Sequence, residues 1–421
     1  MLRPSPVRLR YQVLAFSITR TIVNTAYRMI YPFLPAIARG LGVSLESITL
    51  AITLRSGMGL LSPAFGSFAD VWGRKTALLL GVSLFTAAMV LVAAWPSYPA
   101  LVISLLLVGI SKIIFDPAMY AYLGDRVPYR QRGLAIGLAE FGWSGAFLLG
   151  IPLAGWLIAR AAWPAPFPWA QTAQLGIPLL TGLVPQERWD APFVWLALLG
   201  VGLVMLLWKI LPSDIRQGSS RTSLRQGFRT ILSYPSAVAG LTISILINAS
   251  NETVNIVYGV WMENAFGFQV AALGAASAII GIAELGGEGL VAGFVDRIGK
   301  RRAVGFGLGS LALACVLLPL IGTTWQGALL GLFIFYLAFE FTLVSSIPLM
   351  TELVPSARAT LLAGNVAALS LGRMLGSLLG PVLFTFGLPA NALAAALMNV
   401  IGLAALIFVV RENVAKIPAQ A

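Results

Sequence analysis

Long apolar stretches recur along the whole chain, and they limit what it can fold into more than any other feature. A bilayer core about 30 Å thick needs about 20 residues of helix. By that measure twelve stretches qualify: 11–38, 46–69, 76–95, 98–123, 133–160, 191–211, 236–262, 270–295, 303–322, 325–351, 359–386 and 389–410. Alternating apolar and polar residues are not seen, and lipid cannot satisfy an open strand edge. The sequence therefore predicts an all-α integral membrane protein with twelve transmembrane helices.

Composition supports this class and excludes several others. The chain is 58% hydrophobic and 10% charged, whereas about a quarter of the residues of a soluble domain are charged. The net charge of +12 is explained by loops held on the inner side of a membrane, so we expect no nucleic acid partner. There is no histidine and one cysteine, Cys315, so we expect no metal site and no cofactor, and any proton carrier must be a carboxylate.

The positive charges also predict the orientation. Of 28 Lys and Arg, 20 lie in the two termini and the loops that follow even-numbered helices, with Lys209 counted in the central loop. Three lie on the opposite side: Arg39, Arg160 and Arg188. Positive loops stay in the cytoplasm, so the sequence predicts a multi-pass protein of the inner (plasma) membrane with both termini inside.

Two short basic loops have nearly the same sequence. GSFADVWGRK spans Gly66–Lys75, and AGFVDRIGKR spans Ala292–Arg301, 226 residues later. Each joins two apolar segments directly. We interpret them as conformational switch loops, with these residues: Gly66, Asp70, Gly73, Arg74, Lys75, Asp296, Gly299, Lys300 and Arg301.

The order Gly–x–x–x–Asp–x–x–Gly–Arg–Lys in the first loop resembles the signature loop between helices 2 and 3 of the major facilitator superfamily. The resemblance extends along the chain and is greatest to the twelve-helix drug/proton antiporter-like exporters. It implies two pseudo-symmetric six-helix bundles, a small-molecule substrate and protons as partners, and a monomer. It also implies that Asp70 and Arg74 help to stabilise the outward-facing state. The alternative is that the charges of the loop only fix topology.

A polar, basic central segment divides the chain into two halves. We expect an N-terminal bundle over 1–211, a cytoplasmic linker over 212–235 and a C-terminal bundle over 236–421. Asp125–Pro128 after helix 4 is echoed by Glu352–Pro355 after helix 10, at an offset of 227 residues. An insert at 164–190 is flanked by tryptophan-rich repeats, and we favour an interfacial loop over a substrate lid.

Polar residues within two predicted helices share a face. Arg20, Asn24 and Arg28 are spaced i, i+4 and i+8 in helix 1, and helix 7 carries a similar row: Asn248, Asn251, Glu252 and Asn255. Such spacing places each set on one side of its helix. The resemblance implies that helices 1, 4, 7 and 10 line a central cavity, so these faces are candidate substrate contacts. The alternative is a hydrogen-bonded seam between helices.

Other predicted helices carry further ionisable residues: Arg55, Lys112, Asp116, Glu140, Glu284, Glu288, Glu340 and Arg373. Charges in the hydrocarbon usually face a bundle interior or a wet cavity. We add Arg55, Lys112, Asp116, Glu340 and Arg373 to the candidate cavity. The candidate proton carriers are Asp116, Glu140, Glu252, Glu284, Glu288 and Glu340. The N-terminal half is net positive within its spans and the C-terminal half net negative, which indicates a cavity with walls of opposite sign.

Two pairs of these charges have simpler interpretations. Lys112 and Asp116, at i and i+4, can neutralise each other along one helix, which we favour over direct substrate contact. Glu284 and Glu288 lie close on one face, where two negative charges repel, so we expect one of them to be protonated at neutral pH. Pairing with Arg373 or with a cation of another helix is an equal alternative.

The sequence favours transport over any enzyme activity, because no nucleophile constellation or metal site is visible. We expect proton-coupled efflux of a small amphiphilic or lipophilic solute by alternating access. The alternative is a proton symporter or facilitator that imports a small polar metabolite. Related drug exporters carry an arginine twelve residues before a proline of helix 4, where this chain has Leu105, and Lys112 can supply the missing cation.

The first switch loop gives a testable prediction. Asp70→Asn should reduce transport because it alters the balance of conformational states, while insertion into the membrane and ligand binding are retained. Transport in vesicles, measured together with ligand binding, checks this. Normal turnover of the variant would contradict a switch role.

Overall fold

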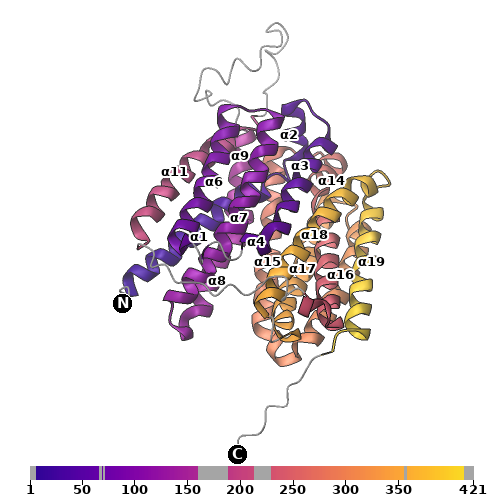
Figure 1. Ribbon diagram of the computed structural model, residues 1–421. Coiled ribbons are helices and arrows are strands. Elements are labelled where there is room, and N and C mark those ends of the chain that lie inside the picture. The colour runs from indigo at the N-terminus through magenta and orange to yellow at the C-terminus, as the bar shows by residue number, and fades with distance from the viewer. Residues whose placement is uncertain are drawn as a thin grey trace, which may run out of the picture.

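The computed structural model describes residues 6–65, 69, 72–159, 188–212, 229–354 and 358–411. Every regular element in these ranges is helical (Figure 1). Gly66 and Asp70 of the first loop, residues 164–187 of the insert and 213–228 of the predicted linker lie outside the described residues.

The helices of the first half correspond to the first six predicted spans. In chain order they are α1 (Pro6–Arg28), α2 (Leu34–Leu41), α3 (Leu45–Gly57), η1 (Met58–Leu61), α4 (Ser62–Phe65), α6 (Arg74–Ala94), α7 (Tyr98–Arg126), α8 (Tyr129–Gly145), η2 (Ala146–Gly150), α9 (Ile151–Ala159) and α11 (Ala191–Ile210). The stretch η2 is π-helical and joins α8 to α9 within one span.

The second half follows the same plan. Its helices are α13 (Pro235–Asn255), α14 (Tyr258–Phe266), α15 (Val270–Ile298), α16 (Lys300–Ile321), α17 (Trp325–Leu353), α18 (Arg358–Phe384) and α19 (Leu388–Phe408). In the described part of the chain, ten helical stretches are long and apolar enough to cross a membrane. The α1–α2 and α13–α14 pairs lie outside these ten and occupy predicted spans 1 and 7.

Spans 1 and 7 were predicted as continuous helices, and this is wrong for both. The first is interrupted between Arg28 and Leu34. Pro32 disfavours helical backbone in the preceding residue and has no amide proton to donate, whereas Pro35 is tolerated in the first turn of α2. The second span is interrupted at Ile256 and Val257.

The two interruptions lie against each other. A Cβ atom at position 259 would lie 2.7 Å from the carbonyl oxygens of both Tyr31 and Pro32. Only glycine lets the start of α14 approach the backbone of the first break so closely. The α2–α14 contact therefore joins the two halves at the end where both short helices lie, at the top of Figure 1.

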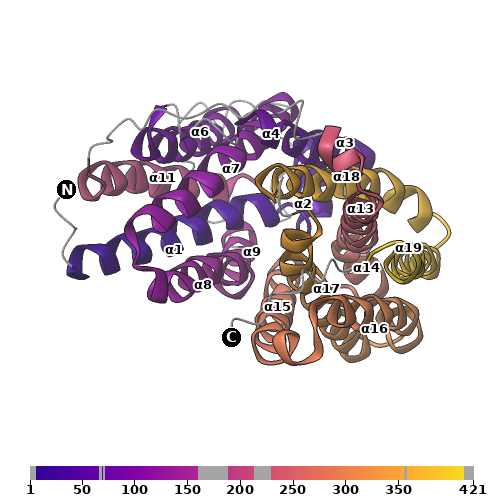
Figure 2. The ribbon, with the colours of Figure 1, turned by 60° about the horizontal axis from the view of Figure 1, so that its bottom comes forward.

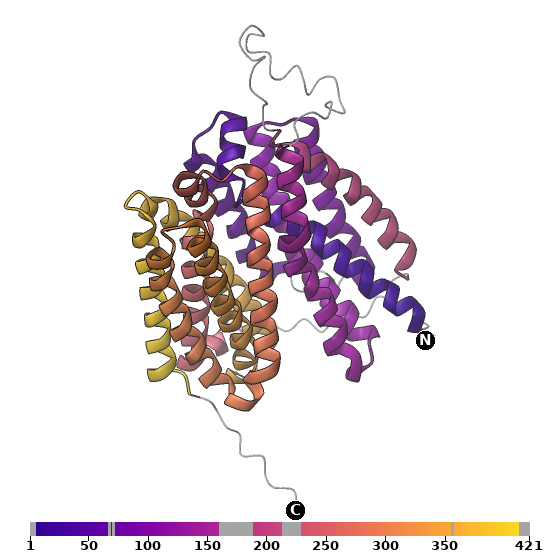
Figure 3. The same cartoon turned by 180° about the vertical axis from the view of Figure 1, so that it is seen from behind.

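Two groups of helices stand side by side, one from each half of the chain (Figure 2). Between the groups α3 packs on α18, and η2 and α9 pack on α15. Figure 3 shows the orange helix α15 beside the magenta helices α8 and α9. Thr53 and Ser377 share a buried hydrogen bond of 2.8 Å across the α3–α18 contact. These contacts position the charged residues of the interior.

The close approach of Gly259 to the first break predicts that adding one methyl group at this position destabilises the protein. Gly259→Ala should destabilise the protein by about 1–3 kcal/mol, because its Cβ overlaps two carbonyl oxygens and forces the backbone apart. Gly309→Ala in α16 is the matched control, because a Cβ there meets no atom within 4 Å. The thermal unfolding midpoint of purified protein should fall only for Gly259→Ala, and equal midpoints would contradict this packing.

Candidate functional site

A buried ion pair joins the two halves. Arg28, the last residue of α1, donates to Glu284 of α15 through both terminal nitrogens, at 2.9 and 2.5 Å. The side chains are 9% and 0% exposed. The guanidinium also lies 4.0 Å from the ring centroid of Trp143 and 3.9 Å from that of Phe147. A bidentate pair between aromatic rings is the geometry in which a buried charge pair is best compensated.

A second connection runs through the break in span 1. Arg55 of α3 donates to the carbonyl oxygen of Tyr27 at 2.5 Å and to the hydroxyl of Tyr31 at 2.8 Å. Because the Tyr31 amide bonds to Arg28, the carbonyl of Tyr27 is one of the acceptors that a helix end leaves unsatisfied. The Tyr31 hydroxyl donates in turn to Glu252 of α13 at 2.7 Å.

The chain of hydrogen bonds continues within the second half. Asn255 donates to Glu252 at 3.3 Å and accepts from Tyr336 of α17 at 2.7 Å. The network thus runs from α3 through the break after α1 and through α13 to α17. It includes the helix 7 residues Glu252 and Asn255, whereas Asn248 Nδ2 and Asn251 Oδ1 have no hydrogen-bond partner among the described residues.

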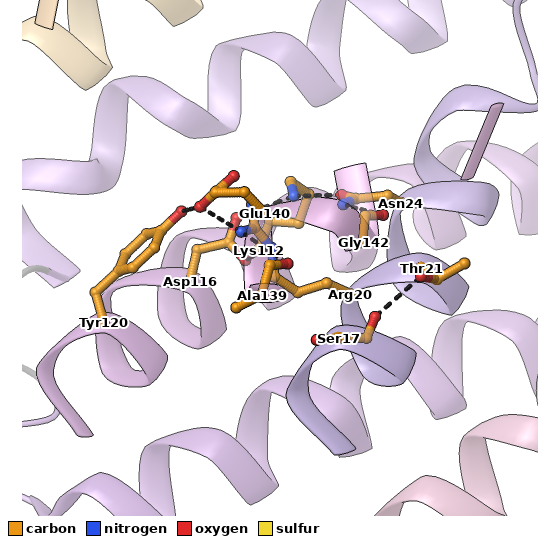
Figure 4. Close-up of polar contacts among 10 residues, drawn as sticks. All are labelled: Ser17, Arg20, Thr21, Asn24, Lys112, Asp116, Tyr120, Ala139, Glu140 and Gly142. Atoms are coloured by element: carbon orange, nitrogen blue, oxygen red, sulfur yellow. Dashed lines mark hydrogen bonds and ion pairs between the residues drawn. The ribbon is translucent and has the colours of Figure 1, made fainter. Parts of the chain in front are cut away.

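A third cluster lies entirely in the first half (Figure 4). Lys112 contacts Asp116 at 2.9 Å and donates to Asn24 at 2.7 Å. Arg20 lies 2.5 Å from Glu140 and 3.7 Å from Asp116. Two cations and two carboxylates therefore balance within this cluster. Lys112 and Asp116 thus contact each other at i and i+4 within one helix.

Two further carboxylates of the second half are near the interhalf ion pair. Glu340 of α17 is 4% exposed, and its Oε2 has no hydrogen-bond partner among the described residues. Its Cβ would lie 2.8 Å from a Cβ at Gly287, so it packs directly on α15. Glu284 and Glu288 lie within electrostatic range of it. Three carboxyls of the second half thus gather near the Arg28–Glu284 pair.

Arg373 of α18 stands apart from these pairs. It is half-buried, makes no ion pair in the described ranges, and acts electrostatically on Tyr27 and Glu252. Cavity walls of opposite sign would allow Arg55 or Lys112 to meet Glu284 or Glu340. None of these contacts forms, because Arg55 bonds to Tyr27 and Tyr31, and Lys112 bonds to Asn24 and Asp116, all in their own half.

The switch loops make matching contacts in the two halves. Arg74 pairs with Asp125 at 3.1 Å, and Lys300 pairs with Glu352. Lys75 donates to the carbonyls of Trp208 and Leu211 at the end of α11, and Arg301 donates to those of Leu406 and Ile407 at the end of α19. Gly73 and Gly299, with φ of 98° and 93°, precede α6 and α16. The side chain of Asp296 is outside the described residues.

Tyrosine and tryptophan side chains contact many of these polar and charged groups. None of these aromatic residues was among the site residues predicted from the sequence. Tyr27, Tyr31 and Trp143 contact the charges above. Tyr336 donates to Asn255, and Tyr120 donates to Glu140. The available signal was weak: Tyr27 and Tyr31 are four residues apart next to Arg28, but neutral aromatic residues are common in apolar helices.

Comparison with known proteins identifies the family. The family model of the Major Facilitator Superfamily matches residues 16–168 and 240–421, which is most of the chain. The chain belongs to the Major Facilitator Superfamily. It is therefore a multi-pass membrane transporter and not an enzyme, as the sequence predicted.

Curated relatives of this major facilitator protein are distant. The uncharacterized MFS-type transporter YwfA of Bacillus subtilis is 25% identical over 389 residues, covering 91% of this chain and 88% of the relative. Multidrug resistance protein 2 of the same organism is 22% identical over 351 residues, covering 82% and 81%.

Solved structures show the same fold. The xylose transporter XylE from E. coli, in an inward open conformation, has a TM-score of 0.74 at 18% identity, covering 97% of this chain and 98% of that one. A bacterial homolog of the human lysosomal transporter Spinster, inward-facing and unoccupied, has a TM-score of 0.72 at 17% identity, covering 97% and 98%.

The interhalf ion pair gives a prediction for a double-mutant cycle. Arg28→Gln or Glu284→Gln alone should cost about 3–5 kcal/mol, because each leaves a buried group without its partner. The double variant Arg28→Gln/Glu284→Gln should lose much less than the sum of the two single losses, in folded yield and in unfolding midpoint, because it leaves no charge stranded. The control cycle pairs Lys112→Gln with Glu340→Gln, which should be additive. Additive losses for Arg28 and Glu284 would contradict their contact.

Proposed function

We propose that this major facilitator protein is a secondary active transporter that works by alternating access. Its twelve spans are the ten apolar stretches together with α1–α2 and α13–α14. The moving units are residues 1–211 and 236–421, connected by 212–235. We place both termini on the cytoplasmic side of the plasma membrane and expect a functional monomer.

The Arg28–Glu284 pair is the observation that carries this proposal. It is buried and connects α1 of one unit to α15 of the other. When the units separate at this depth the pair must break, and both ions then need new partners or water. Binding of a proton by Glu284 removes the need for Arg28. The neighbouring Glu288 and Glu340 make a second charge there unfavourable, which supports proton binding in this carboxyl group cluster.

The proposed cargo is a small amphiphilic or lipophilic solute, exported in exchange for protons. Two relatives are named multidrug resistance proteins. The aromatic side chains around Arg28 and Arg55, such as Trp143 and Tyr27, give apolar surface beside charge. A second candidate is import of a small polar metabolite, favoured by the dense hydrogen-bond network through Tyr31, Glu252 and Asn255.

Transport in proteoliposomes with and without a pH gradient tests this function. Across a panel of amphiphilic and polar solutes, a protonophore should abolish net transport. Glu252→Gln, Glu284→Gln or Glu340→Gln should remove the pH dependence in at least one case, because the lost carboxyl can no longer carry the proton. Glu46→Gln, an exposed carboxylate at the start of α3, is the control. Transport indifferent to the proton gradient would contradict coupling.

A further inference from the structure

The ring of Tyr27 is surrounded by more positive than negative charge. The Arg55 guanidinium lies 3.8 Å from its centroid, and the Lys112 ammonium lies 5.5 Å away. Arg373 and the carboxylate of Glu252 also lie within electrostatic range of this side chain. Three cations from α3, α7 and α18 thus converge on one tyrosine of α1.

The positive charges around Tyr27 outnumber the carboxylates that could balance them. Lys112 and Arg20 are balanced by Asp116 and Glu140. Arg28 is balanced by Glu284. Arg55 and Arg373 have only Glu252 nearby, and that carboxylate is bonded to Tyr31 and Asn255 rather than to either arginine. The group around Tyr27 therefore carries a formal excess of one positive charge.

Arg55 and Arg373 lie within about one helical turn of each other along the α3–α18 contact. Thr53 bonds to Ser377, and a Cβ at Gly57 would lie 3.5 Å from the sulfur of Met374. In α3, Arg55 lies between Thr53 and Gly57, and in α18, Arg373 is next to Met374. About one helical turn therefore separates the two arginines along the contact. The excess charge is thus located at the boundary between the two halves.

Three donors in this region also lack an acceptor. The buried Nε atoms of Arg55 and Arg373 and the Nδ2 atom of Asn248 have no hydrogen-bond partner among the described residues. Asn248 is 3% exposed and contacts α18 beside Arg373, since a Cβ at Gly372 would lie 3.0 Å from the Asn248 Cβ. Buried donors without acceptors are costly. A ligand that brings acceptor oxygens would satisfy those of Arg373 and Asn248, and the nearby charge of Arg55 also favours an anion there.

We propose that Arg373, Arg55 and Asn248 form the subsite for an anionic group, so that the transported solute is an amphiphilic organic monoanion, a carboxylate or sulfonate. The inference rests on the transporter function proposed above. A single negative charge neutralises the excess around Tyr27. Arg373, which is half-buried, contacts the anion directly, and Arg55, 1% exposed, acts through its charge. The apolar body of the solute lies against the neighbouring aromatic rings.

Equilibrium binding to the purified full-length protein in nanodiscs, by calorimetry, tests this subsite. The probes share one apolar body and differ in charge: 2-naphthoate, 2-naphthalenesulfonate, neutral 2-naphthamide and cationic 2-naphthylmethylammonium. We expect at least one anion to bind at least tenfold more tightly than the amide and the cation. Arg373→Gln should weaken that anion at least tenfold and leave the amide unchanged, whereas Arg373→Lys should lose less because it keeps the charge.

Two further variants complete the experiment. Lys209→Gln removes an exposed cation at the end of α11 and should leave all affinities unchanged. Asn248→Ala keeps every charge and should weaken the anion about threefold through a lost hydrogen bond. If Arg373→Gln does not fold, the charge preference of the unaltered protein and Asn248→Ala decide.

The inference is overturned if neither anion binds saturably, if the amide or the cation binds as tightly, or if folded Arg373→Gln retains full anion affinity. Proton-driven transport of neutral or cationic solutes, without anion binding, would refute the anion subsite and still support proton-coupled transport. Anion binding that depends on Arg373, in a protein whose transport ignores the pH gradient, would retain the subsite and refute proton coupling.

Discussion

A charged side chain in the hydrocarbon region is costly unless it has a partner, and most of the charged residues in the interior of this protein are arranged around that requirement. Removing an ion from water costs several kcal/mol that only close, well-oriented groups offset. Arg28 meets Glu284 on another helix and two aromatic rings besides. Arg20 meets Asp116 and Glu140. Each pairing fixes the relative position of the helices that carry it, so the charges define helix packing as much as the apolar residues do.

The helix breaks belong to the same arrangement, because they expose backbone groups that charged residues can use. Ending α1 at Arg28 leaves the carbonyl of Tyr27 free for Arg55. It also turns Tyr31 toward α13, where its hydroxyl bonds to Glu252. The second break brings Gly259 against the first. A continuous helix 1 would have used the Tyr27 carbonyl within the helix, and Arg55 would have lost that acceptor.

The sequence was sufficient for the helical class, the family and most helix positions, because apolar length and loop motifs depend on local composition. The echo of Asp125 by Glu352 corresponds to the contacts of Arg74 and Lys300 with those residues. The breaks in spans 1 and 7 were missed, since a measure of hydrophobicity ignores the backbone effect of Pro32. Helical spacing placed Arg28 on a face but could not identify Glu284, 256 residues away, as the group opposite. Partners across a bundle depend on packing that one helix does not encode.

The distribution of partners also indicates which interactions a rocking motion would disturb. The cluster of Arg20, Lys112, Asp116 and Glu140 is balanced within one half, so it can move as a unit without separating charge. The same holds for the switch-loop pairs, each of which stays in its own half and is partly exposed, where an ion pair contributes less than in the interior. Among the described residues, buried polar contacts between the halves include Arg28 with Glu284, Tyr31 with Glu252, and Thr53 with Ser377. Two of these contain a carboxylate, so the cost of separating the halves at this level depends on the charge state of Glu252 and Glu284.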